Sequence, residues 1–140
     1  MIVFDTSVLY ALLDARDRRH SECVAWYETV REEIATTPLV LAEVDHLAAT
    51  RAGERALRAF RADLSAGAYA VEWWADALSD CVELAEQYAD LGVSLTDASL
   101  VALAARVETT RIATLDERHF RAIRPVSGGP AFRLLPADAG

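Results

Sequence analysis

The chain has 140 residues, of which 53% are hydrophobic, and this is enough for one domain with a core of its own. Its formal net charge of −8 excludes a nucleic-acid binder that works by overall positive charge, but not one that acts through metal ions and a local basic strip. No apolar stretch is long enough to cross a membrane and the N-terminus does not read as a signal peptide, so we expect a cytoplasmic protein with no membrane partner.

Strands and helices are predicted to alternate along the chain. The first half reads as a strand at 2–5, a short helix at 8–14, a helix at 18–34 and a short strand at 35–37. A helix then starts at Pro38 and runs to about Thr50, and Gly53 separates it from a helix at 53–66. In the helix at 18–34, the apolar positions are Val24, Tyr27, Val30 and Ile34.

The second half continues the alternation, with a strand at 68–74, helices at 75–92 and 94–107, a strand at 111–115, a helix at 117–123 and a last strand at 132–136. Leu78, Val82, Ala85 and Ala89 are expected to form the buried face of the first of these helices, which stops at Gly92. The pattern predicts an α/β fold with a mostly parallel sheet, as a single domain over 1–136 followed by a flexible tail at 137–140. Cys23 and Cys81 lack metal-ligand spacing and are expected in the core.

Two acids follow predicted strands. Asp5 closes the first strand and Asp116 follows the strand at 111–115. Parallel strands place their carboxyl ends at one edge of a sheet, where sites form in this class of fold. Each of these acids alone is also a good helix cap, so neither by itself establishes a site.

Two further acids are expected to point inward from helices. Glu43 shares a helical face with Leu39, Val40 and Leu47, which breaks the usual pattern unless an arginine or another cation meets it. Asp97 lies in the first turn of its helix at capping-box spacing from Ser94, yet it sits on the apolar stripe.

Four converging carboxylates repel one another, and a divalent cation relieves this repulsion. Oxygen ligands favour Mg²⁺, with Mn²⁺ as the other candidate, over zinc. The sequence therefore predicts a metal site that can activate water for attack on a phosphate.

Basic residues offer a second, weaker signal. Arg51, Arg55, Arg58 and Arg61 recur at helical spacing, and Arg118 follows Asp116 closely. A solvated helix face is the more ordinary explanation of the stripe, but the same residues could contact RNA phosphates. Because the chain contains no lysine, phosphatases of the haloacid dehalogenase type and response-regulator receivers, which need one, are excluded.

The segments IVFDTSVLYALLD, LVLAEVDHL, LGVSLTDASLVALA and IATLDERHF, in this order, resemble PIN domains, and most closely the VapC-type toxins of bacterial toxin–antitoxin pairs. This resemblance implies an α/β/α sandwich and a metal-dependent endoribonuclease whose catalytic and metal-binding acids are Asp5, Glu43, Asp97 and Asp116. It further implies supporting roles for Thr6 and Thr114, RNA as the substrate, a cognate antitoxin as inhibitor and a homodimer. A non-catalytic interaction module of the same fold, or a PIN nuclease of RNA processing, remains the alternative.

Overall fold

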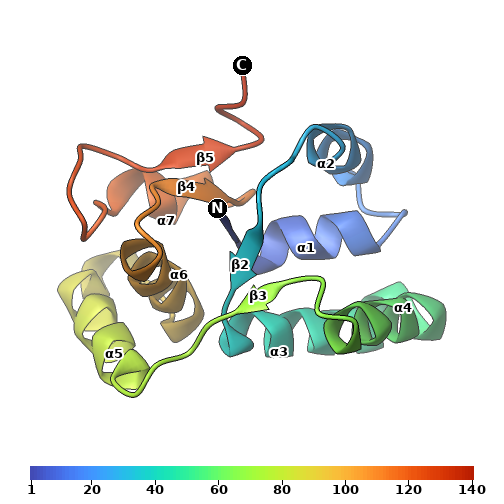
Figure 1. The fold of residues 1–140 in the computed structure, drawn as a ribbon, viewed down its shortest axis with the longest axis horizontal. Helices are drawn as coiled ribbons and strands as arrows, with labels where there is room; N and C mark the ends of the chain where they lie inside the picture. Colours follow the sequence, from blue (N-terminus) through green and yellow to red (C-terminus); the bar gives the residue numbers. More distant parts are fainter.

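A five-stranded parallel sheet in the order β3-β2-β1-β4-β5 forms the centre of the computed structural model, which describes residues 1–140 (Figure 1). The elements follow the chain as β1 (Ile2–Phe4), α1 (Thr6–Leu13), α2 (His20–Tyr27), β2 (Ile34–Thr36), α3 (Pro38–Leu47), η1 (Ala48–Ala52), α4 (Glu54–Ser65), β3 (Ala70–Val71), α5 (Ala77–Gln87), η2 (Ala89–Leu91), α6 (Leu95–Arg106), β4 (Arg111–Ala113), α7 (Glu117–Ala122) and β5 (Arg133–Leu135).

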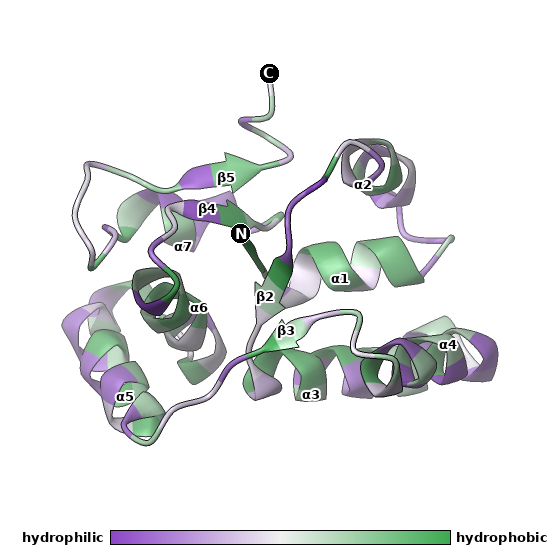
Figure 2. Ribbon diagram, viewed as in Figure 1, coloured by the Kyte–Doolittle hydropathy of each residue, from purple (hydrophilic) through white to green (hydrophobic).

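Helices cover both faces of this sheet. In Figure 1, α1 and α2 lie on one side of the strands, and α5 and α6 lie on the other. Because both faces are covered, the central strand β1, with its sequence Ile-Val-Phe, is buried and apolar throughout, whereas the edge strand β3 is partly exposed. Figure 2 shows hydrophobic β1 and β2 at the centre, while α4 and α5 at the periphery alternate between hydrophobic and hydrophilic residues. The predicted α/β/α sandwich is confirmed.

The parallel register brings the carboxyl ends of β1 and β4 together. Val3 and Phe4 pair with Ile112 and Ala113, and the amide of Asp5 donates to the carbonyl oxygen of Ala113 over 2.9 Å. The residues that follow the two strands therefore start from the same edge of the sheet.

The predicted helix at 18–34 is much shorter in the structure. It ends at Tyr27, and Ile34 belongs to β2. Its buried residues are Cys23 and Trp26, whereas Tyr27 is exposed. The terminal carbonyl oxygens find side-chain donors instead of a further helical turn: Thr29 Oγ1 donates to Trp26 over 2.6 Å, and Arg31 donates to Glu28 over 2.7 Å.

The predicted buried face of α5 is wrong. Leu78 and Val82 are 57% and 44% exposed, while Cys81 and Leu84 pack into the core. The helix is thus rotated about its axis relative to the prediction. Helix α5 ends at Gln87, and Gly92 closes the following turn with a left-handed φ of 68°, as its predicted role as a stop requires.

The helix predicted from Pro38 to about Thr50 is α3, which continues as the π-helical segment η1 until Gly53. Gly53 has a φ of 94°, a conformation that side chains disfavour, and it separates η1 from α4. The strand expected at 68–74 shrinks to the two residues of β3 at the edge of the sheet. Both cysteines are buried and free, as expected.

The ends of the domain stay a prediction. Within the segment 137–140, the carboxylate of Asp138 accepts from the amide of Leu134 over 2.8 Å and from the guanidinium of Arg121 over 2.7 Å. None of the helices combines the length and the apolar character that a membrane span requires.

Candidate active site

Asp5 sits at the edge of the sheet directly after β1 and caps α1. It is 5% exposed, and protein groups fully engage its carboxylate. Oδ1 accepts from the amide of Thr6 over 2.7 Å, while Oδ2 accepts from Thr114 Oγ1 over 2.7 Å and from Ser7 Oγ over 2.9 Å. Three donors orient this carboxylate before any ligand arrives.

Burial raises the pKa of Asp5 to about 6, and the nearby charge of Asp97 adds to the effect. The hydrogen bonds from Thr114, Ser7 and the Thr6 amide act in the opposite direction, and they only partly offset the burial. Burial therefore makes the ionised form of Asp5 unfavourable in free energy, and a positive ion beside it would reduce this penalty.

The two hydroxyls that hold Asp5 also fix the loop after β4. Ser7 Oγ accepts from the amide of Leu115 over 2.9 Å, and Thr114 Oγ1 accepts from the amide of Asp116 over 3.0 Å. The same hydrogen-bond network thereby couples the position of Asp5 to the backbone of Asp116.

Asp97 and Asp116 converge on one imidazole. His119 Nδ1 lies 3.0 Å from Asp97 Oδ2 and 3.3 Å from Asp116 Oδ2. One ligand atom from each of these three residues lies within 4.8 Å of the others, the arrangement expected of residues that hold a metal ion. The side chains of Asp97 and Asp116 are 16% and 38% exposed, so this group is open to solvent where Asp5 is not.

Local helix starts explain the placement of both acids. Ser94 caps α6 by accepting the amide of Asp97 over 3.1 Å, so the expected capping contact forms. Asp116 caps α7 through the amide of His119 over 3.4 Å, which brings the imidazole back over the same carboxylate. Asp97 and Asp116 therefore both lie at helix starts, and their carboxylates still converge on His119.

Glu43 lies differently from its prediction. It is exposed on α3, between the buried residues Val40 and Val44, and its carboxylate makes no hydrogen bond or ion pair. The argument that Glu43 is buried and therefore needs a cation is wrong. Exposure leaves this carboxylate free to turn toward a ligand, and its role in the site stays a prediction.

The two threonines with expected supporting roles differ in their contacts. Thr114 hydrogen-bonds Asp5, whereas Thr6 contributes only its backbone amide. The hydroxyl of Thr6 is buried without a hydrogen-bond partner, beside the carboxylate of Asp5. Orphaned buried hydroxyls are uncommon in proteins, and the supporting role expected of the Thr6 side chain stays a prediction.

Two residues of the network were not among the predicted site residues. Ser7 lies in the first turn of α1, and His119 lies three residues after Asp116 on α7. The spacing of His119 from Asp116 placed both on one helical face, but a histidine at that spacing is common without a functional role. Only the contact with Asp97, 22 residues away in sequence, reveals it.

The donor set suits a divalent cation. Carboxylate oxygens are the ligands that Mg²⁺ and Mn²⁺ prefer. The imidazole of His119 adds a nitrogen ligand, whereas the sequence predicted oxygen ligands only. The buried, hydrogen-bonded Asp5 and the orphaned Thr6 hydroxyl lie at the same edge.

The arginines of the predicted RNA-binding stripe fall into two groups. Arg58 pairs with Glu54 over 2.6 Å, and Arg61 pairs with Asp45 over 2.8 Å. Arg51, Arg55 and Arg118 have no carboxylate within ion-pair distance. The structure thus leaves three of the five predicted basic residues available for a ligand.

Comparison with known proteins gives the family. A model of the PIN domain matches residues 2–124. Ribonuclease VapC26 of Mycobacterium tuberculosis is 36% identical over 139 residues, which cover 96% of this chain and 100% of that protein.

Comparison with solved structures agrees with this family assignment. The M. tuberculosis toxin VapC20, described as cleaving the sarcin–ricin loop, matches with a TM-score of 0.80 at 26% identity, over 93% of this chain and 100% of that one. A toxin–antitoxin complex from Klebsiella pneumoniae matches with a TM-score of 0.69 at 21% identity, over 89% of this chain and 94% of that one, and supports the fold alone. The chain therefore belongs to the PIN domain family and is of the VapC type.

Proposed function

We propose that this protein is the toxin of a toxin–antitoxin pair and acts in the cytoplasm as a divalent-metal-dependent endoribonuclease. The observation that carries the proposal is the convergence of Asp97, Asp116 and His119 within 4.8 Å, beside the buried carboxylate of Asp5. Membership of the VapC type supports RNA as the substrate. The likeness to VapC20 favours a structured RNA loop over a long duplex, because that relative is described as cleaving one.

Each residue has a defined part in this proposal. Asp97 and Asp116 would hold a Mg²⁺ or Mn²⁺ ion, and Asp5 and Glu43 would complete its negative surroundings. A bound divalent ion supplies water activation and neutralises charge on the phosphate under attack. Thr114 and Ser7 hold Asp5 in a single orientation, which spares the site reorganisation during the reaction.

The first experiment is cleavage of RNA by the purified protein with Mg²⁺, with Mn²⁺ and with EDTA. We expect cleavage with either ion and none with EDTA. Sequencing of the 5′ ends of cellular RNA after induction then identifies the substrate. Cleavage that continues unchanged in EDTA would refute the metal requirement, and absence of all cleavage would favour the non-catalytic interaction module.

An antitoxin belongs to the same proposal. Without its ion the site holds several carboxylates in close proximity, and an arginine can fork two of them with paired hydrogen bonds. An antitoxin that offers such an arginine would displace the ion and block the substrate. The partner to test is the product of the gene beside this one, with and without its arginines, during a Mg²⁺ titration of cleavage.

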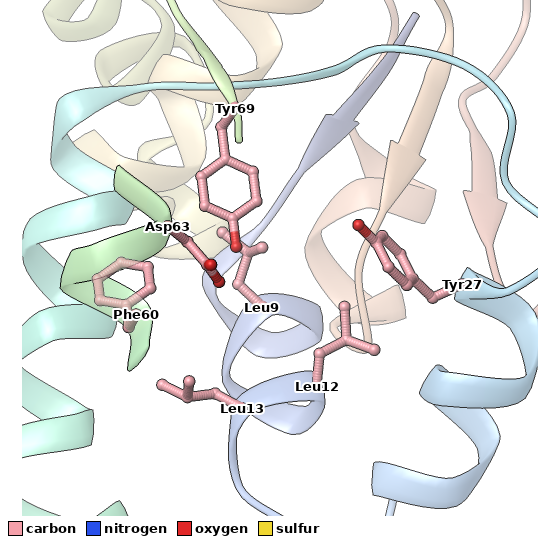
Figure 3. A pocket seen from close by; sticks show the side chains of 7 residues that line it. All are labelled: Leu9, Leu12, Leu13, Tyr27, Phe60, Asp63 and Tyr69. Atoms are coloured by element: carbon pink, nitrogen blue, oxygen red, sulfur yellow. The ribbon is translucent and has the colours of Figure 1, made fainter. Parts of the chain in front are cut away.

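Apolar surface near the site is available for the rest of such a partner. A pocket of about 150 Å³ lies between α1, α2 and α4, and Figure 3 shows Leu9, Leu13, Phe60 and Tyr69 around it. A hydrophobic anchor in this pocket would add affinity beyond the charge pair. Leu12 also lines this pocket and is only half-buried, so substitution of Leu12 by Ala should weaken antitoxin binding while RNA cleavage persists.

A homodimer is also part of the proposal. The exposed Leu78 and Val82 on α5 provide apolar surface that water disfavours. Sedimentation analysis of the wild-type protein against a Leu78→Glu variant tests whether this surface joins two copies.

A further inference from the structure

A groove lined by two arginines lies at the end of α1 that is remote from Asp5. It has a volume of about 350 Å³ and opens between the C-terminal end of α1 and the start of α4. Arg16 and Arg55 line it, and its other residues are mostly alanines. Small side chains allow a ligand's backbone to approach closely, while they offer no deep apolar pocket for a protein side chain.

A third arginine stands beside the groove. The guanidinium of Arg16 donates to the carbonyl oxygen of Arg51, which ties the loop after α1 to η1. Burial and the adjacent Asp14 raise the pKa of Tyr10, and the charges of Arg51 and Arg16 act against this rise. Both guanidinium groups are therefore close enough to act on the same phenol at the end of α1.

One carboxylate faces these three arginines. Asp14 accepts from Tyr10 over 2.7 Å and from the amide of Arg16 over 2.9 Å, and its contact with the guanidinium of Arg16 is long, at 3.5 Å. The side chain of Arg16 is 74% exposed. The groove thus keeps a net positive charge that its own residues do not cancel.

The neighbouring arginines of α4 carry no such uncompensated positive charge. Arg58 and Arg61 are each matched by an acid, Glu54 and Asp45. Arg51 and Arg55 precede them on the same stretch of chain and have no such partner. The structure therefore separates two pairs of arginines that the sequence presents as one stripe.

The charge of the whole chain directs a polyanion to this end. Residues 62–105 hold eight acids and no arginine, so the net charge of −8 originates entirely in that segment. Five of these acids lie on α5 or within three residues of it, at the opposite end of the long axis from α4 (Figure 1): Asp76, Asp80, Glu83, Glu86 and Asp90. A polyanion is repelled at the α5 end and attracted at the α4 end.

We propose that RNA substrates extend from the acidic site along α1 and place backbone phosphates against Arg16, Arg51 and Arg55. This proposal rests on the function proposed above. The eight residues of α1 span about 12 Å, so the groove lies within a few nucleotides of the cleaved bond. Arginine forks bind phosphate oxygens in pairs, and an alanine floor without aromatic residues gives no base stacking, so the groove positions RNA without reading its sequence.

The test compares two double variants of equal charge change, Arg51→Gln/Arg55→Gln and Arg58→Gln/Arg61→Gln. Cleavage of a long single-stranded RNA and of a dinucleotide too short to reach the groove is measured for both. We expect the first variant to raise KM for the long RNA with kcat unchanged, and to cleave the dinucleotide like the wild type. The second variant should behave like the wild type on both.

Binding without cleavage gives an independent readout. Fluorescence anisotropy with the same RNA, in EDTA and across a salt titration, should show that the first variant lowers the slope of log K against log salt by about 0.7 for each RNA phosphate that it no longer neutralises. Equal slopes and equal KM values for the two variants would overturn the proposal. The same holds if the first variant loses affinity only for the neighbouring gene's protein, because the groove would then serve a protein partner. Failure of the proposed function itself is distinct, since the wild type would then cleave neither RNA.

Discussion

The two halves of the acidic site are built in opposite ways. Asp5 is buried at 5% exposure, and three donors from the protein fix it, whereas Asp97 and Asp116 are partly exposed and share a single imidazole nitrogen. The first half is complete without a ligand, whereas in the second half only the amide and the imidazole nitrogen of His119 contact the two carboxylates. This difference suggests that Asp5 supplies a fixed charge, while the open pair adjusts to the ion and the substrate.

Replacement of Asp5 by Asn should have the largest effect. An amide can keep its oxygen on the Thr6 amide and turn its nitrogen toward the hydroxyls of Ser7 and Thr114, which can rotate to accept. We therefore expect cleavage to fall by more than about 100-fold, beyond the range usual for a supporting residue, with the fold retained. The measurements are kcat/KM and thermal melting; wild-type activity would show that Asp5 is only a helix cap.

Removal of one hydroxyl that holds Asp5 should have the next largest effect. Thr114→Val keeps the shape but loses the 2.7 Å bond to Asp5 and the acceptor for the Asp116 amide. Loss of such a supporting partner typically reduces metal affinity or activity by about 10- to 100-fold.

The matched control is Thr36→Val. Thr36 is equally buried at the end of the neighbouring strand, where its hydroxyl donates to the carbonyl oxygen of Phe4 over 3.0 Å. It should lower the melting temperature without a change in the Mg²⁺ concentration needed for half-maximal cleavage. An equal Mg²⁺ requirement in both variants would contradict the role of Thr114.

Glu43→Gln tests whether the exposed acid on α3 joins the open half of the site. We expect at least about a 10-fold loss of activity, comparable to removal of a supporting partner. The control is Asp45→Asn, two residues away on α3, where the acid pairs with Arg61 and should be dispensable for cleavage of a dinucleotide. If both variants retain full activity, Glu43 is a solvated surface residue.

The pH dependence of stability gives the smallest effect. Because the pKa of Asp5 is about 6 in the folded state and 3.8 otherwise, the folded protein binds the extra proton between these values. The free energy of unfolding of the metal-free protein should therefore fall as pH rises from about 4 to about 6, by at most about 3 kcal/mol.

Other acids act in the opposite direction at lower pH. Hydrogen bonds from Arg121 and the Leu134 amide lower the pKa of Asp138 to about 2. The stability that its ionised carboxylate contributes is therefore lost as the pH falls below about 4. Urea unfolding of the wild type and Asp5→Asn in EDTA isolates the Asp5 contribution, because the variant should lack the decline above pH 4. A decline of the same size in both proteins would assign it to other groups.

Much of the fold was predictable because its signals are local. The apolar run before Asp5, Pro38 at a helix start and Gly92 at a helix stop each specify backbone geometry through a few neighbouring atoms. The placement of Asp5 and Asp116 at one edge of the sheet was also predictable, because parallel pairing of β1 and β4 brings their carboxyl ends together. The family resemblance drew on the same segments, and the match over residues 2–124 agrees with it.

The sequence alone thus determined the α/β class, the order of elements and the acids that end up at one sheet edge. Tertiary packing decided the rest. It turned α5 so that Cys81 and Leu84, instead of Leu78 and Val82, meet the core, since a helix with apolar residues on two flanks can bury either. It placed His119 between two acids far apart in sequence and left Glu43 in solvent. It also paired Arg58 and Arg61 with acids while leaving Arg51 and Arg55 unpaired, because such contacts depend on distances in space that sequence spacing does not fix.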